Sequence, residues 1–203
     1  MKKLAIIFLL GFFVCNGIAQ QADSLFNLGK NQFEIGNYKE AINYFKQTLQ
    51  LQQNYKGAHY ICAMAEYNLK HYDRAIVYFN NAITQNTLNS NAYLFKAISY
   101  KNLKNSKQAL NTLNIILKTD SLNPLLLFEK ASVFLSQKKY KVAIPFYQQT
   151  LALNANLEKA TNELGLCYYY LYNKIKACEY WSKLNDPDDF ENYELIIKTC
   201  HNH

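Results

Sequence analysis

The chain has 203 residues and a formal net charge of +7 at pH 7. Half of its residues are hydrophobic, and only three are proline and six are glycine, which argues against a β-sandwich or a disordered chain and favours long helices with short connections. The positive charge could indicate a nucleic-acid partner, but the single arginine, Arg74, offers few of the bidentate contacts that phosphate and guanine recognition use, so we expect none.

Residues 1–19 predict a secretory signal peptide. Two lysines precede an unbroken apolar or glycine run over residues 4–15, and small residues, Gly17 and Ala19, suit a cut after Ala19. The run is shorter than the ~20 residues that a spanning helix needs, so removal is favoured over a retained anchor. Cys15 leaves a lipoprotein as an alternative, although the preceding residue, Val14, is not small. We therefore expect an exported protein, periplasmic or secreted, with envelope association left open.

Small residues recur every 34 positions along the rest of the chain. One series is Ala41, Ala75, Ala109, Ala143 and Ala177; the other, always 12 residues earlier, is Gly29, Ala63, Ala97, Ala131 and Gly165. This spacing, with a turn between, places the two small residues on facing helices of a hairpin, and a bulky residue four positions after each first-series alanine lies on the same helix face. Each hairpin leaves an apolar flank exposed, so we expect five of them to stack into a solenoid.

The pattern resembles the tetratricopeptide repeat (TPR) family, whose unit is two antiparallel helices in 34 residues. The first unit carries the family's signature most fully, in Leu28-Gly29, Gly36-Asn37-Tyr38, Glu40-Ala41-Ile42 and Tyr44-Phe45. The third and fifth units depart from it at the turn, where Ser106 and Lys174 replace an aromatic residue. The resemblance covers about residues 22–189 and implies an all-α fold, a right-handed α-solenoid of five helix-turn-helix repeats.

The segment after the fifth unit predicts a capping helix over residues 187–200. Asp186-Pro187-Asp188-Asp189 is typical of a helix start, with an N-cap residue, proline in the first turn and acids near the positive end of the helix dipole. Phe190, Tyr193, Ile196 and Cys200 then form an apolar stripe. We expect this helix to cover the open face of the last hairpin.

The resemblance also implies a concave groove lined by the first helix of each unit. Aromatic side chains there would anchor a partner peptide, because they bury a large area with few rotatable bonds. The alternative is that several of them pack on one another or on a second protomer. The predicted groove positions are Phe26, Lys30, Phe33, Tyr60, Met64, Tyr67, Asn68, Asn91, Leu94, Ile98, Lys101, Asn102, Leu125, Phe128, Leu135, Leu166, Tyr169 and Tyr170.

The sequence contains no motif of an enzyme or of a cofactor site. No G-x-S-x-G, H-E-x-x-H, P-loop or G-x-G-x-x-G occurs, and we expect neither a cofactor nor a specific metal site. Because an exported protein can form disulfides, a bridge between Cys167 and Cys178 of the fifth hairpin is conceivable, with buried free thiols as the alternative.

The sequence therefore predicts a non-catalytic scaffold that binds a protein or peptide segment in an aromatic groove. Two other functions stay open: a subunit of a bacterial envelope assembly that uses its convex face or edges, and a carbohydrate-binding protein whose tyrosines stack on sugars. We expect no membrane-spanning segment after residue 19, and exposed groove aromatics leave homo-oligomer formation open.

Overall fold

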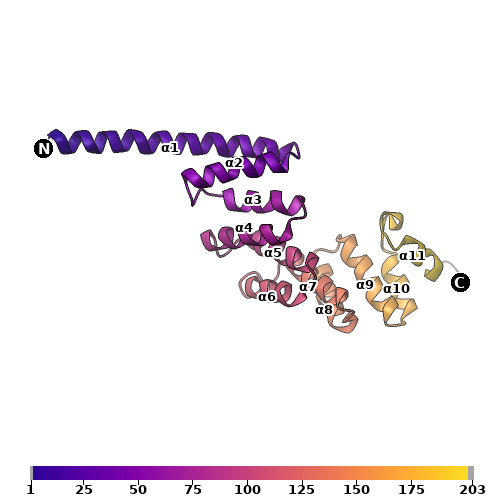
Figure 1. The fold of residues 1–203 in the computed structure, drawn as a ribbon. Helices are drawn as coiled ribbons and strands as arrows, with labels where there is room; N and C mark the ends of the chain where they lie inside the picture. Colours follow the sequence, from indigo (N-terminus) through magenta and orange to yellow (C-terminus); the bar gives the residue numbers. More distant parts are fainter. Residues whose placement is uncertain (1, 201–203) are drawn as a thin grey trace. The chain divides into compact units, whose positions relative to one another are not determined.

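A computed structural model describes the backbone of residues 2–200 and the side chains of residues 17–200 (Figure 1). The described chain is all-α, and no strand occurs within residues 2–200. Its helices, in order, are α1 (Lys2–Glu34), α2 (Tyr38–Leu51), α3 (Ala58–Asn68), α4 (Tyr72–Gln85), α5 (Ser90–Asn102), α6 (Ser106–Ile116), α7 (Pro124–Ser136), α8 (Tyr140–Leu153), α9 (Glu158–Tyr170), α10 (Lys174–Trp181), the 3-10 helix η1 (Pro187–Asp189) and α11 (Tyr193–Cys200).

The helix ends keep the 34-residue period. The first helices of the five pairs end at Glu34, Asn68, Asn102, Ser136 and Tyr170, and the second helices begin at Tyr38, Tyr72, Ser106, Tyr140 and Lys174. The predicted all-α fold of five helix-turn-helix repeats is therefore confirmed, including the weaker third and fifth units. Helix α8 runs through Pro145, whose ring lies on the exposed side of the helix.

Each turn within a pair requires a residue with left-handed backbone. Gly36 supplies it in the first pair, at φ 81°. Non-glycine residues take the same place in the other four turns, namely Lys70, Lys104, Lys138 and Tyr172 at φ 58–62°. This residue ends the first helix. The backbone N–H of the residue after it then donates to a carbonyl five positions earlier, as Asn37 N does to Gln32 O at 2.8 Å.

The helices form two compact units, residues 1–103 with α1–α5 and residues 104–203 with α6–α11. The border lies in the turn of the third pair, between Leu103 and Lys104. The continuous solenoid that we predict over residues 22–189 stays a prediction, because the structure defines each unit by itself.

The first unit is held together by small residues facing large ones. Phe45 of α2 is fully buried against Gly29 of α1, where a Cβ built on the glycine would come 2.6 Å from the Phe45 ring. Phe79 of α4 is also fully buried and packs with Ala63 of α3. These contacts are the close helix approach that the two small-residue series predict.

The second unit repeats this packing around Tyr147 and Trp181. Tyr147 of α8 is fully buried, and its hydroxyl donates a hydrogen bond to the Glu163 carboxylate of α9. Trp181 of α10 lies over Gly165 of α9, and its Nε1–H donates to the backbone oxygen of Asn162 at 3.2 Å. Burial of these polar groups is therefore compensated by hydrogen bonds.

The capping helix predicted over residues 187–200 is wrong in its extent. The segment forms the 3-10 turn η1, and Phe190 then has extended backbone at φ −100° and ψ 137°, so α11 begins only at Tyr193. The Asp186 side chain makes no capping hydrogen bond, so the helix predicted over residues 187–200 lacks the N-cap that it would need at its start. Instead, the amides of Asn192 and Asn162 bond reciprocally at 2.8 and 3.0 Å and attach the segment to α9.

The bridge between Cys167 and Cys178, which the sequence left open beside buried free thiols, does not form. Cys178 of α10 forms a disulfide with Cys200 at the end of α11, and Cys167 is a fully buried free thiol. The reason is the rotation of α10: Ala177 and Trp181 face α9, and the next residue, Cys178, therefore points toward another side of the helix. The disulfide ties α11 to α10.

Helix α1 is continuous from the predicted signal region into the first repeat, and Figure 1 shows its N-terminal part extending beyond α2. The side chains of residues 17–21 are exposed, and Ala22 is the first buried residue among those whose side chains are described. None of the helices in the described residues is both long and apolar enough to cross a membrane.

Candidate functional site

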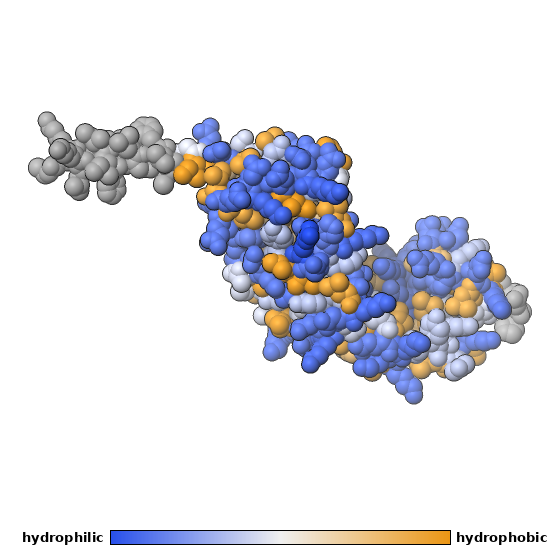
Figure 2. Space-filling view, in the orientation of Figure 1, coloured by the Kyte–Doolittle hydropathy of each residue, from blue (hydrophilic) through white to orange (hydrophobic). Residues whose placement is uncertain are grey.

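Four predicted groove residues line one apolar pocket in the first unit. The pocket lies between α1 and α3 and has a volume of about 310 Å³. Its predicted members are Lys30, Phe33, Tyr60 and Met64, and the structure adds Glu34 and Ile61. On the face shown in Figure 2, hydrophobic residues reach the surface in small groups between hydrophilic ones.

The aromatic rings of this pocket are fixed from behind by the second helices. Phe33 packs edge-on against Tyr38 of α2, with ring centroids 5.4 Å apart, and Tyr60 packs against Phe79 of α4 at 6.1 Å. Both rings are half-buried, so each keeps a surface toward the pocket. Burial raises the pKa of the Tyr60 hydroxyl, which stays a neutral donor and acceptor at physiological pH. A ring held in this way loses little freedom when a ligand covers it.

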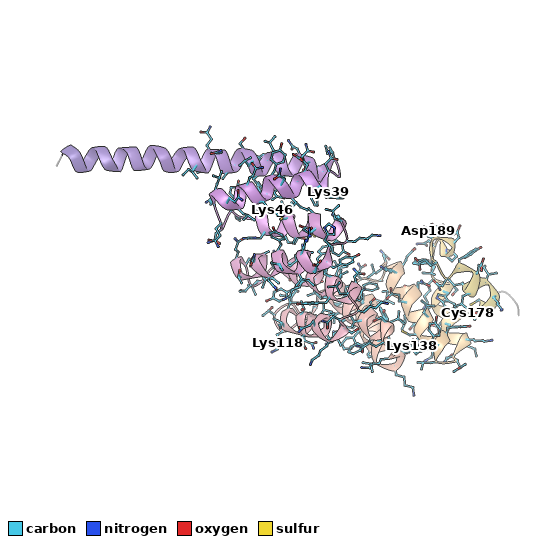
Figure 3. All side chains as sticks on the ribbon, in the orientation of Figure 1. Lys39, Lys46, Lys118, Lys138, Cys178 and Asp189 are labelled. Carbon is cyan, nitrogen blue, oxygen red and sulfur yellow. A yellow bond between two sulfur atoms is a disulfide. The ribbon has the colours of Figure 1, made fainter. Side chains whose placement is uncertain are left out.

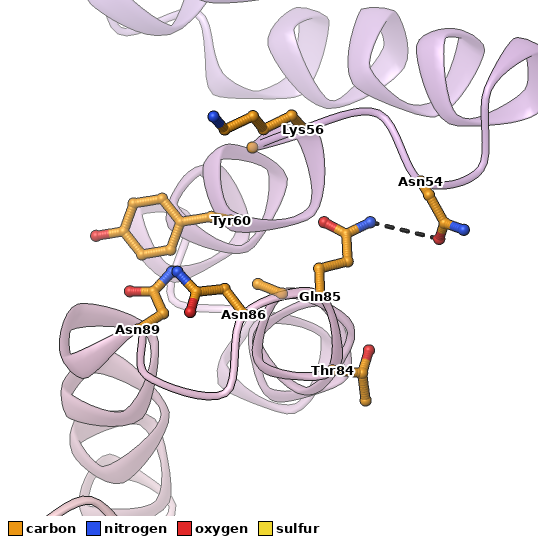
Figure 4. Close-up of a pocket in the computed structure, with 9 residues that line it drawn as sticks. Asn54, Lys56, Tyr60, Thr84, Gln85, Asn86 and Asn89 are labelled. Carbon is orange, nitrogen blue, oxygen red and sulfur yellow. Dashed lines mark hydrogen bonds between the residues drawn. The ribbon is translucent and has the colours of Figure 1, made fainter. Parts of the chain in front are cut away.

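Tyr60 also borders a second, polar pocket of about 750 Å³ (Figure 4). This pocket lies where the loops after α2 and α4 meet, and amides dominate its polar lining. Figure 4 shows the Asn86 and Asn89 side chains pointing toward the Tyr60 ring. The remaining lining residues are Asn54, Lys56, Gly57, Ala82, Thr84 and Gln85.

The amide oxygens in the polar pocket already accept hydrogen bonds from the chain. Asn89 Oδ1 caps α5 by accepting from Ala92 N at 3.0 Å, and Asn86 Oδ1 accepts from Leu88 N at 3.1 Å. Their NH₂ groups therefore remain as donors for a ligand with acceptor oxygens, such as the carbonyls of an extended peptide. Sequence reasoning missed these residues because the resemblance places ligand contacts on the first helices, whereas Asn86 and Asn89 lie in a loop between repeats.

The other predicted groove positions of the first unit lie outside the apolar pocket between α1 and α3. Phe26 packs on Phe45 and Tyr55, with centroids 5.7 and 4.7 Å apart, and Tyr67 packs edge-on against Tyr72 and Phe95. Both rings are half-buried and pack on rings of other helices, which agrees with the alternative that the sequence left open. Leu94 is buried, Ile98 and Lys101 are half-buried, and the exposed members are Asn68, Asn91 and Asn102.

Phe128, a predicted groove anchor of the second unit, lies in the core. It is 5% exposed and packs against Tyr147 with ring centroids 5.8 Å apart. The placement on an open groove surface is therefore wrong for Phe128, because its ring turns toward α8. Tyr169 is half-buried against Trp181, while Tyr170 is 47% exposed and stacks on Tyr140.

Three further groove positions of the second unit face the C-terminal segment. Leu135, Leu166 and Tyr170 line a pocket of about 650 Å³ whose other side is formed by residues 189–192 and Leu195. The sequence did not predict this neighbour, because it assigned the segment to the open end of the last hairpin. In the second unit, residues 189–192 and Leu195 therefore occupy part of the surface that a partner would contact in the predicted groove.

The described residues give no candidate for a metal site or a reactive thiol. They include no group of three or more His, Cys, Asp or Glu side chains placed to hold a metal ion. The two free thiols within the described chain, Cys62 and Cys167, are buried, and this burial raises the pKa of each to about 12, so neither is a thiolate near neutral pH. His201 and His203, whose side chains are of a metal-binding type, lie outside the described residues.

A tandem of helix pairs with apolar and amide-lined pockets defines a helical-repeat protein of the binding type. Two family models match the chain. One, described as anaphase-promoting complex, cyclosome, subunit 3, matches residues 7–82, and a tetratricopeptide repeat model matches residues 96–158. The chain belongs to the tetratricopeptide repeat family.

Solved structures with the same fold are similar over most of the chain. A tetratricopeptide repeat protein from Parabacteroides merdae has 14% identity and a TM-score of 0.77, and the match covers 89% of this chain and 73% of that one. MamA from Desulfovibrio magneticus has 18% identity, a TM-score of 0.74 and coverage of 88% and 96%. YrrB, described as a TPR protein with an unusual peptide-binding site, has 17% identity, a TM-score of 0.67 and coverage of 86% and 90%. No curated protein sequence matches the chain.

Proposed function

We propose that the chain is a non-catalytic scaffold that binds an extended protein segment across Tyr60. The observation that carries this proposal is the position of Tyr60, which borders the apolar pocket between α1 and α3 and also the amide-lined pocket beside it. An extended peptide presents apolar side chains and backbone carbonyls at short, regular intervals, so it suits two adjoining pockets of opposite character. YrrB, which has the same fold, is described as having a peptide-binding site, and this supports a peptide as the class of ligand.

In this mechanism one bulky apolar side chain enters the pocket formed by Phe33, Tyr60 and Met64. Next to it, peptide carbonyls accept from the Asn86 and Asn89 amides. Lys30 and Glu34, four residues apart on α1, place one charge of each sign at the rim and fix the direction of the segment. Because the rings are already held by α2 and α4, most of the free energy of burying them goes into binding.

The test is peptide selection against the chain, followed by calorimetry with the selected peptides. We expect Phe33→Ala and Tyr60→Ala each to weaken binding by about tenfold or more, since buried aromatic anchors dominate such interfaces. The matched control is Val77→Ala on α4, an exposed residue outside both pockets, which should leave the affinity unchanged. Equal affinity for the native chain and Phe33→Ala would contradict the proposal. Phe128 is unsuitable for this test because it lies in the core.

A carbohydrate ligand is the second candidate, favoured by one observation. Tyr60 beside the Asn86 and Asn89 amides combines an aromatic face with hydrogen-bond donors, which is chemistry that also suits a sugar ring. A sugar held there would show saturable calorimetric binding that Tyr60→Ala and Asn86→Ala abolish and Phe33→Ala leaves intact. A subunit of an envelope assembly that uses other faces would keep its partners in all three variants.

We also infer that the protein is exported and that residues 1–19 are removed. The exposure of residues 17–21, ahead of the first described buried residue, Ala22, supports this inference, because a cut after Ala19 removes no buried side chain from residues 17–19. Mass spectrometry of the protein from its native host should give an N-terminus at Gln20. A chain that retains residues 1–19, or one cut before Cys15 and lipidated, would contradict the inference.

A further inference from the structure

Two apolar side chains of the second unit project into solvent at the turn between α9 and α10. Tyr172 is 95% exposed and Ile175 is 85% exposed, and they are the two most exposed large hydrophobic residues among those described. Burying such side chains is favourable, so leaving both almost fully solvated on a folded protein calls for a partner surface. Tyr172 also takes the left-handed backbone of this turn, at φ 61°, where glycine would be less strained.

The neighbouring turn, between α7 and α8, lies beside this one. Tyr140, the first residue of α8, stacks on Tyr170 at the end of α9, with ring centroids 5.0 Å apart and planes inclined by 17°. The two turns therefore form one edge of the second unit, which we call the turn edge. It comprises residues 138–142 and 172–176.

All the charged residues of the turn edge are lysines. Lys138, Lys139, Lys141, Lys174 and Lys176 are all exposed, and Lys138 is labelled in Figure 3. No acidic residue occurs in residues 130–157 or 164–178. None of these five lysines forms an ion pair in residues 17–200, and Lys176 lies over the Tyr168 ring at 5.2 Å. The lysines therefore present positive charge that the protein itself does not neutralise.

We propose that the turn edge docks on an anionic phospholipid surface, with Tyr172 and Ile175 entering the headgroup region between the lysines. Each lysine held near an anionic bilayer strengthens binding by roughly fivefold, and a tyrosine or isoleucine at the interface adds apolar burial. This interaction uses a different unit from the peptide site around Tyr60, so it goes beyond the proposed function.

The observations favour a lipid surface over other acidic partners. The lysines surround two protruding apolar tips instead of a groove, and a flat fluid surface can receive such tips without a complementary pocket. Nucleic acid is a poorer match because the turn edge contains no arginine for bidentate phosphate contacts. An acidic protein segment would leave Tyr172 and Ile175 exposed unless it carried a matching apolar surface.

The test is cosedimentation of the full chain with two kinds of vesicle, pure phosphatidylcholine and phosphatidylcholine with roughly one phosphatidylglycerol in three lipids. The apolar run over residues 4–15 is common to all variants, so the readout is the ratio of binding to anionic and to neutral vesicles. The first variant is Lys139→Gln with Lys141→Gln and Lys174→Gln. Its matched control is Lys39→Gln with Lys46→Gln and Lys118→Gln, which changes the net charge equally at exposed positions outside the turn edge (Figure 3). A second variant is Tyr172→Ser with Ile175→Ser.

We expect the turn-edge lysine variant to lose the preference for anionic vesicles by roughly 100-fold, and the control by about threefold or less. The Tyr172→Ser and Ile175→Ser variant should bind anionic vesicles at least about tenfold more weakly, since two apolar side chains no longer enter the interface. Circular dichroism should show the same helix content for all, because every substituted side chain is exposed.

Three outcomes would overturn the proposal. Equal losses in the turn-edge variant and its control would mean diffuse charge attraction. Full binding by the Tyr172→Ser and Ile175→Ser variant would remove the insertion. Finally, binding of polyglutamate or of single-stranded DNA that depends on the turn-edge lysines, without binding to anionic vesicles, would assign this surface to an acidic polymer.

Discussion

Gly165 of α9 lies directly against the indole of Trp181 of α10, so closely that a Cβ on the glycine would come 2.4 Å from Nε1. The same relationship, also 16 residues apart, joins Gly29 to Phe45. In the second and fourth repeats alanine stands at the first position instead, and Ala63 packs with Phe79 and Ala131 with Tyr147. Glycine is therefore required where the facing ring sits closest to the helix backbone.

Gly165→Ala should destabilise the protein despite the better helix propensity of alanine. The added methyl group must displace an indole that is nearly fully buried and hydrogen-bonded to Asn162, and overpacking of this kind costs about 1–3 kcal/mol. Urea unfolding followed by circular dichroism measures the loss. The same substitution in a Trp181→Phe background should cost clearly less, because the smaller ring leaves room. An equal cost in both backgrounds would show that the indole is not the obstacle.

Cys178→Ser should lower the stability of the second unit by about 3 kcal/mol, the chain-entropy value for a crosslink across 22 residues. Thermal unfolding should be sensitive to dithiothreitol in the native chain and insensitive in Cys178→Ser, which serves as the control for effects of the reductant elsewhere. Peptide mapping without reduction should recover Cys178 joined to Cys200. Recovery of Cys178 joined to Cys167 would contradict the structure.

Acid should weaken the first unit through His59. This ring is buried, its Nε2 bonds Gln53 O at 3.1 Å and its Nδ1 has no partner. Burial lowers the pKa of His59 below its ordinary value of 6.5, a shift that the bond to Gln53 opposes in part. The unfolded chain therefore binds this proton more readily, and the contribution of neutral His59 to stability is present above pH 6.5 and is lost as the pH falls toward its lower folded pKa.

The measurement is the free energy of unfolding in urea at a series of pH values for the native chain and for His59→Gln. Glutamine can keep the donation to Gln53 O and does not titrate, so its stability should fall less between neutral and mildly acidic pH. His71→Gln, which removes the pairing of His71 with Glu66, is the control and should retain the His59 dependence. Parallel pH profiles for the native chain and His59→Gln would refute this assignment.

Replacing the left-handed turn residues by glycine should stabilise the protein, whereas the substitutions above destabilise it. Lys70→Gly and Lys138→Gly should each stabilise the protein by about 0.5–1 kcal/mol, because glycine adopts the positive φ of these positions without a Cβ clash. Gly36→Lys should cost a similar amount, and its cause would be the backbone alone, since no atom lies within 4 Å of a Cβ there. Chemical denaturation compares the three variants, and a destabilising Lys138→Gly would contradict this account.

The repeat register could be predicted from the sequence because it depends on local physics. A 34-residue spacing of alanine, glycine and bulky residues defines which face of each helix meets its partner, and the helix ends follow that period in all five pairs. The resemblance to the family supplied the groove positions, and four of them, Lys30, Phe33, Tyr60 and Met64, line one pocket. These positions follow from a repeated geometry that any unit of the family shares.

The features that could not be predicted from the sequence depend on contacts that do not recur from one repeat to the next. The C-terminal segment occurs once, so no period predicts that Asn192 pairs with Asn162 or that Cys200 reaches Cys178. Phe128 illustrates the same limit within the repeat: its spacing places it on the first helix, but the spacing does not show that its ring packs against Tyr147 in the core. The amides of Asn86 and Asn89 escaped prediction because loop residues have no fixed face.

The bond between Cys178 and Cys200 has a mechanical consequence. A force applied at the end of α11, whether from a protease that unravels its substrates or from a tether, is transmitted through the two sulfur atoms directly to α10. The force therefore does not act on the residues between the two cysteines, and they cannot be unfolded one helical turn at a time from the C-terminal side. Unravelling from that side must begin at Cys178, next to Ala177, which is fully buried in the core of the second unit.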